Sequence, residues 1–219
     1  MKLQDNTTAQ SIVVLGANGG IGREVVKQAL AEGHYVTAIL RTPKKLTITH
    51  ENLKVIQGNI LDPKSLLEAF EGNDIVVSAI GNNSIKKTTL FSEGSKNVIE
   101  AIEFIGINRA FFISASGIDV NPTHSWIVRF ATKYILQTIL RNVYADQVLM
   151  ENLIKKSRID WTIVRPPKLL DKPKTGLYRV STQGFLNNGL SISRADVAHF
   201  ILNNLDNSNT VHKTVEIAY

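Results

Sequence analysis

The sequence contains no cysteine, so disulfide bonds and thiolate metal sites are excluded. Its five histidines are scattered, and no two stand four residues apart, the spacing that places two imidazoles on one helix face. No apolar run approaches the ~20 residues that span a bilayer. The first ten residues, MKLQDNTTAQ, lack the apolar core of a signal peptide. We therefore expect a cytoplasmic protein with no metal site and no membrane partner.

Positive charge is in modest excess: 25 lysines and arginines against 19 acids give a net charge of +6. The basic residues are spread thinly, in pairs such as Lys44–Lys45 and Lys86–Lys87, and form no block of five or six like charges. This spread favours a solvated, lysine-rich surface, with attraction of phosphate groups and binding of nucleic acid as the alternatives. The sequence does not indicate an oligomeric state.

Short apolar runs alternate with segments of helical period along the 219 residues. We expect strands at 11–16, 35–40, 53–58, 74–81, 109–116 and 161–166, and helices at 20–32, 63–72, 92–106 and 142–157. This alternation predicts βαβ units and an α/β fold, a Rossmann-type doubly wound, mainly parallel sheet with flanking helices in a single domain. The C-terminal part is less regular, with short strands expected at 176–181, 190–193 and 213–218 and a helix at 194–205.

A glycine-rich turn, Gly16-Ala17-Asn18-Gly19-Gly20-Ile21-Gly22, follows the first expected strand and opens the first expected helix. The first glycine permits a tight turn, the second lets backbone approach a pyrophosphate, and the third lets helix and strand pack closely. The free N–H groups that open the helix attract phosphate. An ordinary glycine-rich turn is the alternative, but the strand–turn–helix context favours dinucleotide binding.

The second expected strand ends at Leu40 and is followed by Arg41, where NAD-binding proteins often carry an acid for the ribose hydroxyls. A guanidinium forms bidentate hydrogen bonds with phosphate, and Lys44 and Lys45 follow closely. A surface arginine is the alternative. We expect Arg41 to bind a 2′-phosphate, which makes NADP(H) the predicted cofactor.

Six motifs occur in order between residues 11 and 217: GANGGIG, ILRTPKKL, GNILDPKSL, VVSAIG, DWTIVRPPKL and SRADVAHFIL. Together they resemble the atypical short-chain dehydrogenase/reductases, in particular the NAD(P)H-binding group that includes biliverdin-IXβ/flavin reductases and NmrA-like proteins. The resemblance implies a flexible N-terminal tail (1–10) and one NAD(P)-binding Rossmann domain (11–219) with a small C-terminal substrate region. It is specific for fold and cofactor, not for a substrate.

The resemblance also implies a set of cofactor-binding residues, matched position by position. Those expected at the pyrophosphate are Gly16, Asn18, Gly19, Gly20, Ile21 and Gly22. Those expected at the 2′-phosphate and adenine are Arg41, Lys45, Asn59, Ile60 and Asp62, although the family often has Asp in place of Asn59. Those expected at the ribose and nicotinamide are Ala79, Ile80, Gly81, Pro166 and Pro167.

The tyrosine–lysine pair of typical family enzymes is missing. Its best match is Tyr144-Ala-Asp-Gln-Val148, and valine cannot supply the cation that lowers the tyrosine pKa. Tyr134, followed by Thr138, is a second candidate, and a purely structural role is the alternative for both tyrosines. We expect Ser114 or Ser116, at the end of the fifth strand, to matter more for catalysis than Tyr144.

These residues predict an NADP(H)-dependent oxidoreductase that transfers hydride to a small conjugated acceptor such as a flavin or quinone. The resemblance implies that flavin-type reductases also lack the lysine. A non-enzymatic, NADP(H)-sensing NmrA-like regulatory protein is the alternative. A sugar-nucleotide epimerase or dehydratase ranks last, because it needs the tyrosine–lysine pair and a larger C-terminal lobe.

Overall fold

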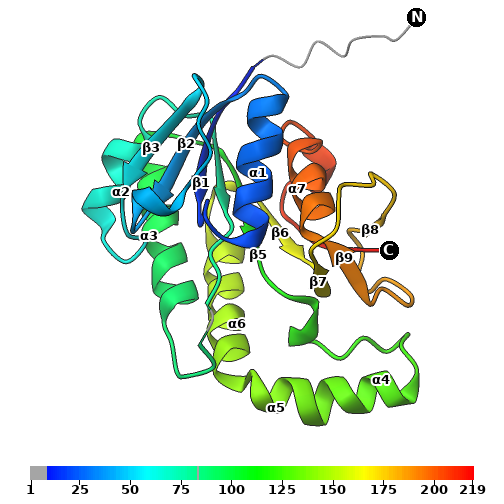
Figure 1. The fold of residues 1–219 in the computed structure, drawn as a ribbon. Helices are drawn as coiled ribbons and strands as arrows, with labels where there is room; N and C mark the ends of the chain where they lie inside the picture. Colours follow the sequence, from blue (N-terminus) through cyan, green and yellow to red (C-terminus); the bar gives the residue numbers. More distant parts are fainter. Residues whose placement is uncertain (1–8, 83) are drawn as a thin grey trace, which may run out of the picture.

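The computed structural model describes residues 9–82 and 84–219 (Figure 1). Residues 1–8 of the expected N-terminal tail lie outside this part. The expected single-domain Rossmann-type architecture is confirmed, with a central sheet between two layers of helices.

Eight strands form the central sheet in the order β3-β2-β1-β4-β5-β6-β10-β8. Neighbouring strands are parallel except for the edge pair of β8 and β10. The bounds are β1 (Ser11–Leu15), β2 (Tyr35–Leu40), β3 (Leu53–Gln57), β4 (Ile75–Ser78), β5 (Arg109–Ile113), β6 (Asp160–Arg165), β8 (Arg179–Ser181) and β10 (Lys213–Ala218). Strand order reverses between β1 and β4, the position where doubly wound sheets bind ligands at the carboxyl ends of their strands.

The two faces of the sheet carry separate apolar cores. On β1, Ile12 and Val14 point into the core shared with α1 (Gly20–Ala31) and α7 (Arg194–Leu202). Val13 and Leu15 point into the other core, which is covered by α2 (Pro63–Phe70), α3 (Leu90–Ile105) and α6 (Arg141–Lys156). Because side chains alternate along a strand, burial on both faces explains the continuous apolar run in the sequence.

A buried carboxylate fixes α3 against α6. Asp146 on α6 accepts hydrogen bonds from the backbone N–H groups of Phe91, at 2.8 Å, and Ser92, at 3.2 Å, and from the Ser92 hydroxyl. These groups open α3, where backbone N–H groups lack intrahelical partners. The first turn of α3 is thereby held beside the ends of β4 and β5.

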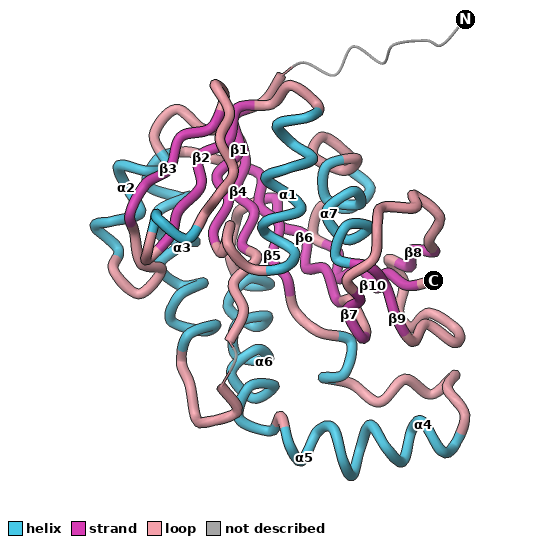
Figure 2. Tube along the Cα trace, in the orientation of Figure 1, coloured by secondary structure: helices cyan, strands magenta, loops and turns pink. Residues whose placement is uncertain are grey.

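The helices and strands expected from the sequence are present, with ends that differ by a few residues. Two features were missed. One is a short parallel ribbon of β7 (Lys168–Leu170) and β9 (Ser191–Ser193), of which β9 alone was expected (Figure 2). The other is a helical run of α4 (Trp126–Phe130), a π-helical stretch (Ala131–Leu136) and α5 (Gln137–Ile139). Within the described residues, no helix combines the length and apolarity needed to cross a membrane.

Candidate functional site

A cleft of about 710 Å³ opens at the carboxyl edge of the sheet, at the strand-order reversal. Its floor is the glycine-rich turn after β1, and one wall is the loop after β2. The opposite wall is built by the ends of β4 and β5 and by Leu140, Val143, Tyr144 and Gln147 at the start of α6. Backbone and short side chains dominate the floor, so a ligand can lie directly on the main chain.

The glycine-rich turn is packed too tightly for side chains at two positions. Gly16 has a φ of +76°, and a Cβ there would lie 2.4 Å from the Ala79 carbonyl oxygen. A Cβ on Gly22 would lie 2.3 Å from the Gly16 carbonyl oxygen. Gly19 closes the turn by donating its N–H to that same oxygen at 2.8 Å. The requirement for glycine is therefore steric, and it brings the start of α1 to the edge of β4.

The start of α1 faces the cleft without a side-chain cap. Gly19 is the N-cap residue, and the first turn carries no acid. By contrast, α2 is capped by Asp62, whose carboxylate accepts from the Lys64 N–H. The uncapped N–H groups and the positive end of the helix dipole are suited to an anion such as a pyrophosphate. The cradle thus fits the phosphates of a dinucleotide.

Three charged side chains line the cleft, and all are basic: Arg41, Lys45 and Arg194. No aspartate or glutamate is present among the described residues that form its walls. Arg41 and Lys45 lie at the end of β2 and in the short helical turn that follows, whereas Arg194 comes from the start of α7. A ligand that spans the cleft from Arg41 and Lys45 to Arg194 binds most favourably if it carries negative charge near both groups.

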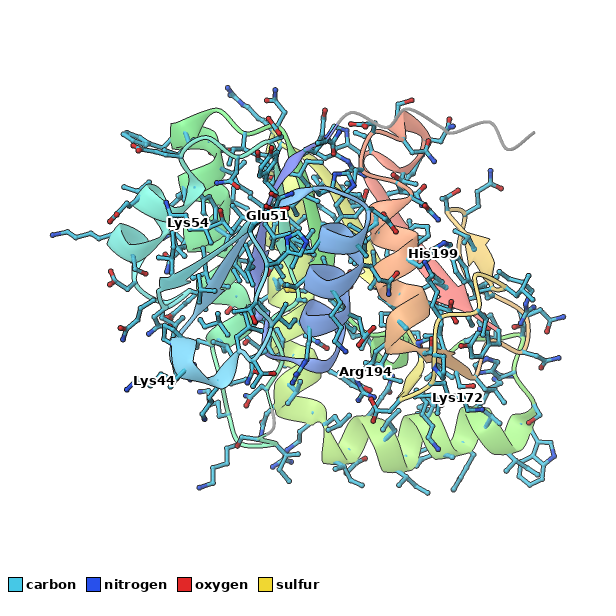
Figure 3. All side chains as sticks on the ribbon, turned by 45° about the horizontal axis from the view of Figure 1, so that its top comes forward. Lys44, Glu51, Lys54, Lys172, Arg194 and His199 are labelled. Carbon is cyan, nitrogen blue, oxygen red and sulfur yellow. The ribbon has the colours of Figure 1, made fainter. Side chains whose placement is uncertain are left out.

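Arg194 was not expected at the site, because SRADVAHFIL predicted a helix and contributed to the family resemblance without assigning a role to the arginine. A Cβ on Gly20 would lie 2.3 Å from the Cδ and Nε of Arg194. The Arg194 side chain therefore covers Gly20, the first residue of α1 (Figure 3). One Nη donates to Asp171 Oδ1 at 2.7 Å, but the aspartate is largely exposed and the pair is weak. The β7–β9 ribbon brings these two residues together, since Asp171 follows β7 and Arg194 follows β9.

Most of the residues expected to bind the cofactor do line this cleft. They are Gly16, Asn18, Gly19, Gly20, Ile21, Arg41, Lys45, Asn59, Ile60, Ala79, Ile80 and Gly81, joined by the catalytic candidates Ser114 and Tyr144. The others are not among its lining residues. Gly22 packs beneath the turn, Asp62 caps α2, and Ser116, Pro166 and Pro167 lie outside the cleft wall.

Ser114 is joined to a buried ion pair beneath the strand ends. Its hydroxyl donates to Glu151 Oε1 at 2.7 Å, and Arg165 donates to both carboxylate oxygens at 2.7 and 2.6 Å. Lys155 donates to Oε2 at 3.0 Å. Burial alone would raise the pKa of Glu151, but Arg165, Ser114 and Lys155 lower it below its usual value. Because the Ser114 hydroxyl already donates its proton to Glu151, its oxygen can only accept hydrogen bonds from a ligand in the cleft.

Tyr144 lies at the cleft with its hydroxyl beside Gly117, where an added Cβ would approach it to 2.4 Å. Burial raises the pKa of this phenol above its usual 10.0. Tyr144 is therefore protonated at neutral pH and can donate a hydrogen bond, and its raised pKa makes it a weaker acid than free tyrosine. Val148, at the missing lysine position, does not line the cleft.

Gln147 is a second residue that the sequence did not reveal. It follows Tyr144 by three positions on α6, which places both on one helix face, and both line the cleft. Its Oε1 is buried and has no hydrogen-bond partner within the described part of the chain. A buried unpaired acceptor is costly, by about 1–3 kcal/mol, and a ligand donor would satisfy it.

Fold and cleft together define a Rossmann-fold NAD(P)-binding protein. The chain belongs to the NAD(P)H-binding family, whose model matches residues 16–208. The resemblance to an NAD(P)H-binding group is thereby confirmed.

The full length of the chain has relatives of similar size. The uncharacterized sugar epimerase YhfK from Bacillus subtilis (strain 168) is 28% identical over 213 residues, covering 94% of this chain and 92% of YhfK. The anaerobillin reductase ChuY from Escherichia coli O157:H7 superposes with a TM-score of 0.78 at 22% identity, covering 95% of this chain and 96% of ChuY. A short-chain dehydrogenase/reductase from Veillonella parvula in complex with NADP gives 0.77 at 18%, covering 97% and 95%. At these identities the two structures establish the fold alone.

The Glu151–Arg165 pair generates a prediction on stability. Glu151→Gln leaves the largely buried guanidinium of Arg165 without its main counter-charge, so we expect a loss of about 3 kcal/mol in the free energy of unfolding at pH 7. The Glu151 contribution is complete above the unfolded-state pKa of 4.5 and is lost as the pH falls through the lower folded-state pKa. The difference between wild type and variant should therefore shrink as the pH falls below 4.5.

Urea unfolding of both proteins across this pH range measures the effect. Glu24→Gln is the matched control, because it removes the carboxylate of an exposed pair with Lys27 and should change stability by less than about 1 kcal/mol. A difference between wild type and Glu151→Gln that does not depend on pH would contradict the assignment.

Proposed function

We propose that this protein is an NADPH-dependent oxidoreductase that reduces a small conjugated acceptor, such as a flavin or quinone. The observation that carries the proposal is the charge of the cleft. A glycine-floored groove beside an uncapped helix is lined by Arg41, Lys45 and Arg194, with no acid among its described lining residues. This arrangement favours a dinucleotide with an additional phosphate.

Each part of the dinucleotide has a matching surface. The uncapped N–H groups of α1 and the guanidinium of Arg194 would hold the pyrophosphate. Arg41 and Lys45 would hold the 2′-phosphate, and Asn59 and Ile60 would border the adenine. Ala79, Ile80 and Gly81 line the middle of the cleft and would border the ribose. When bound, the cofactor supplies the hydride, and the protein orients it and limits access of water.

The other end of the cleft combines apolar and hydrogen-bonding groups. Leu140, Val143 and Leu169 provide an apolar surface for a flat acceptor and for the nicotinamide ring. Ser114 can accept and Tyr144 can donate a hydrogen bond, and the unpaired amide oxygen of Gln147 can accept a third. These groups can orient the carboxamide or a carbonyl of the acceptor.

The protonation state of Tyr144 favours reduction over oxidation. Oxidation of a hydroxyl, the first step of many sugar epimerisations, needs a base to remove its proton. Tyr144 has a raised pKa and no lysine beside it, so it is a donor at neutral pH. A phenol in this state can hydrogen-bond to an acceptor that gains hydride. We therefore favour a reductase over the epimerase activity in the printed name of YhfK.

A prediction on cofactor affinity separates the two phosphate sites. Arg41→Ala should weaken NADPH binding about ten- to a hundredfold and leave NADH binding nearly unchanged, because only NADPH carries the 2′-phosphate. Arg194→Ala should weaken both cofactors to a similar extent, because both carry the pyrophosphate. Calorimetric titration of each variant with each cofactor gives the comparison.

Arg158→Ala is the matched control, since it removes an equal charge from an exposed position outside the cleft. It should bind both cofactors as the wild type does. Equal affinity of the wild type for NADPH and NADH would contradict the preference for NADP(H). An Arg194→Ala variant with unchanged binding would remove Arg194 from the site.

A further prediction concerns Tyr144. Tyr144→Phe should lower kcat for NADPH oxidation by about tenfold, with little change in NADPH affinity, because a hydrogen bond made at the transition state is lost. Steady-state rates with a panel of flavins, quinones and tetrapyrroles would identify the acceptor and measure the loss. Tyr134→Phe, at an exposed tyrosine outside the cleft, should match the wild type.

Ser116→Ala should also be silent, because Ser116 does not line the cleft. An unchanged kcat in Tyr144→Phe would contradict the proposed donor. A wild-type protein that binds NADPH but oxidises it with no member of the panel would favour the NADP(H)-sensing alternative.

A further inference from the structure

The helical run of residues 126–139, here called the apolar segment, is left without a partner. It follows one edge of the molecule, away from the sheet (Figure 1). None of its residues is buried, and its large apolar side chains are between 53% and 75% exposed at Trp126, Ile127, Phe130, Tyr134, Ile135 and Ile139. Soluble proteins rarely expose so many adjacent apolar groups without a function.

The exposed side chains are arranged in stripes. Trp126, Phe130 and Tyr134 are four residues apart, and the rings of Phe130 and Tyr134 lie 4.8 Å from each other. Ile135 and Ile139 are also four apart and form a second stripe. A short helix gains little stability from its own hydrogen bonds. A surface that covers these stripes would stabilise the segment.

The charges around the apolar segment have a single sign. No acid occurs between Asp119 and Asp146, whereas Arg129, Lys133 and Arg141 are basic. Arg129 and Lys133 are exposed and form no ion pair with any described residue. Aromatic and aliphatic side chains combined with lysine and arginine are typical of helices that lie in the interface of an anionic membrane.

A second copy of the chain fits this surface less well. In a two-fold symmetric pair the same patch would face itself, which would bring Arg129 and Lys133 near their equivalents. The segment contains no acid to balance these charges. Anionic lipid headgroups provide the complementary charge, and the acyl region accepts the aromatic side chains.

We propose that the apolar segment docks the protein on an anionic lipid surface. The expectation of no membrane partner rested on the lack of a spanning run, and a helix that lies on the surface needs none. The C-terminal end of the segment adjoins the cleft: Gln137 donates to the carbonyls of Gly117 and Ile118, at 3.1 and 2.9 Å, and Leu140 lines the cleft wall.

Docking would therefore place the cleft close to the lipid, where an apolar conjugated acceptor dissolves. This consequence depends on the proposed reductase function, whereas lipid binding itself does not.

The protein carries its own reporter for the test. It has two tryptophans; Trp126 is 75% exposed and Trp161 is buried. Vesicles of phosphatidylcholine with added phosphatidylglycerol should shift the tryptophan emission to shorter wavelength and carry the protein down on sedimentation. Vesicles of phosphatidylcholine alone should do neither. High salt should weaken the binding, because the lipid charge is screened.

Variants of the segment show which contacts matter. Phe130→Ser and the double variant Arg129→Glu with Lys133→Glu should each weaken vesicle binding by about tenfold or more. Phe104→Ser is the matched control, because Phe104 on α3 is a phenylalanine that is even more exposed than Phe130, at 77% against 54%. Trp126→Phe should abolish the spectral shift but leave sedimentation with anionic vesicles in place.

Two results would overturn the inference. One is equal or absent binding to neutral and anionic vesicles. The other is a dimer in light scattering that Phe130→Ser dissociates, which would assign the surface to a second copy. NADPH titration of the same samples keeps the two proposals apart. If the wild-type protein binds NADPH normally but does not bind anionic vesicles, only the docking surface is overturned. If it binds anionic vesicles but not NADPH, only the cofactor site is overturned.

Discussion

The close approach of the glycine-rich turn to β4 is the constraint on which the site depends. The Gly16 backbone lies against the Ala79 carbonyl, and Gly22 lies against Gly16, so neither position has room for a side chain. Because the turn is this tight, α1 begins at the strand-order reversal and directs its free N–H groups into the cleft. The same contact brings Ala79, Ile80 and Gly81 to the cleft wall.

The charged residues that line the cleft differ from those that lie beneath it. Basic groups alone provide the formal charges of the described cleft wall, which suits a polyanionic ligand. Directly below, the Glu151 carboxylate is neutralised by Arg165 and Lys155 and accepts the Ser114 proton. The paired charges hold the ends of β5 and β6 and α6 in register without adding negative charge to the cleft. Tyr144, a protonated phenol whose pKa is raised by burial, adds a hydrogen-bond donor to the cleft wall.

The sequence revealed the elements whose burial and turn chemistry are local. The strands β1, β4 and β5 are buried on both faces and therefore read as continuous apolar runs, and the glycine spacing marked the turn. Arg41 was found because it directly follows a recognisable strand. Arg194 could not be placed, because its contact with Gly20 depends on the packing of α7 against α1 and on the β7–β9 ribbon, whose three-residue strands carry a weak pattern.

Gln147 and the apolar segment were missed for other physical reasons. In the family pattern the lysine stands at position 148, but the helix places the side chain of Gln147, not that of Val148, at the cleft. The apolar segment has exposed apolar groups on several sides and a π-helical stretch from Ala131 to Leu136, so it lacks the 3.6-residue period of a helix packed on one face. An apolar sequence usually indicates a buried helix, whereas the apolar side chains of this segment are exposed to solvent.

A calorimetric titration of Gly19→Val with NADPH tests the central claim most directly. Gly19 has a φ of −75°, which valine tolerates, but an added Cβ would lie 3.1 Å from the Gly16 carbonyl oxygen, so the turn must relax by a few tenths of an ångström. Circular dichroism and the thermal midpoint of the variant would show that it folds despite this contact. Its isopropyl group would occupy the surface on which the pyrophosphate rests, so NADPH binding should be lost. Unchanged NADPH affinity in a folded Gly19→Val protein would show that the dinucleotide does not lie on this turn.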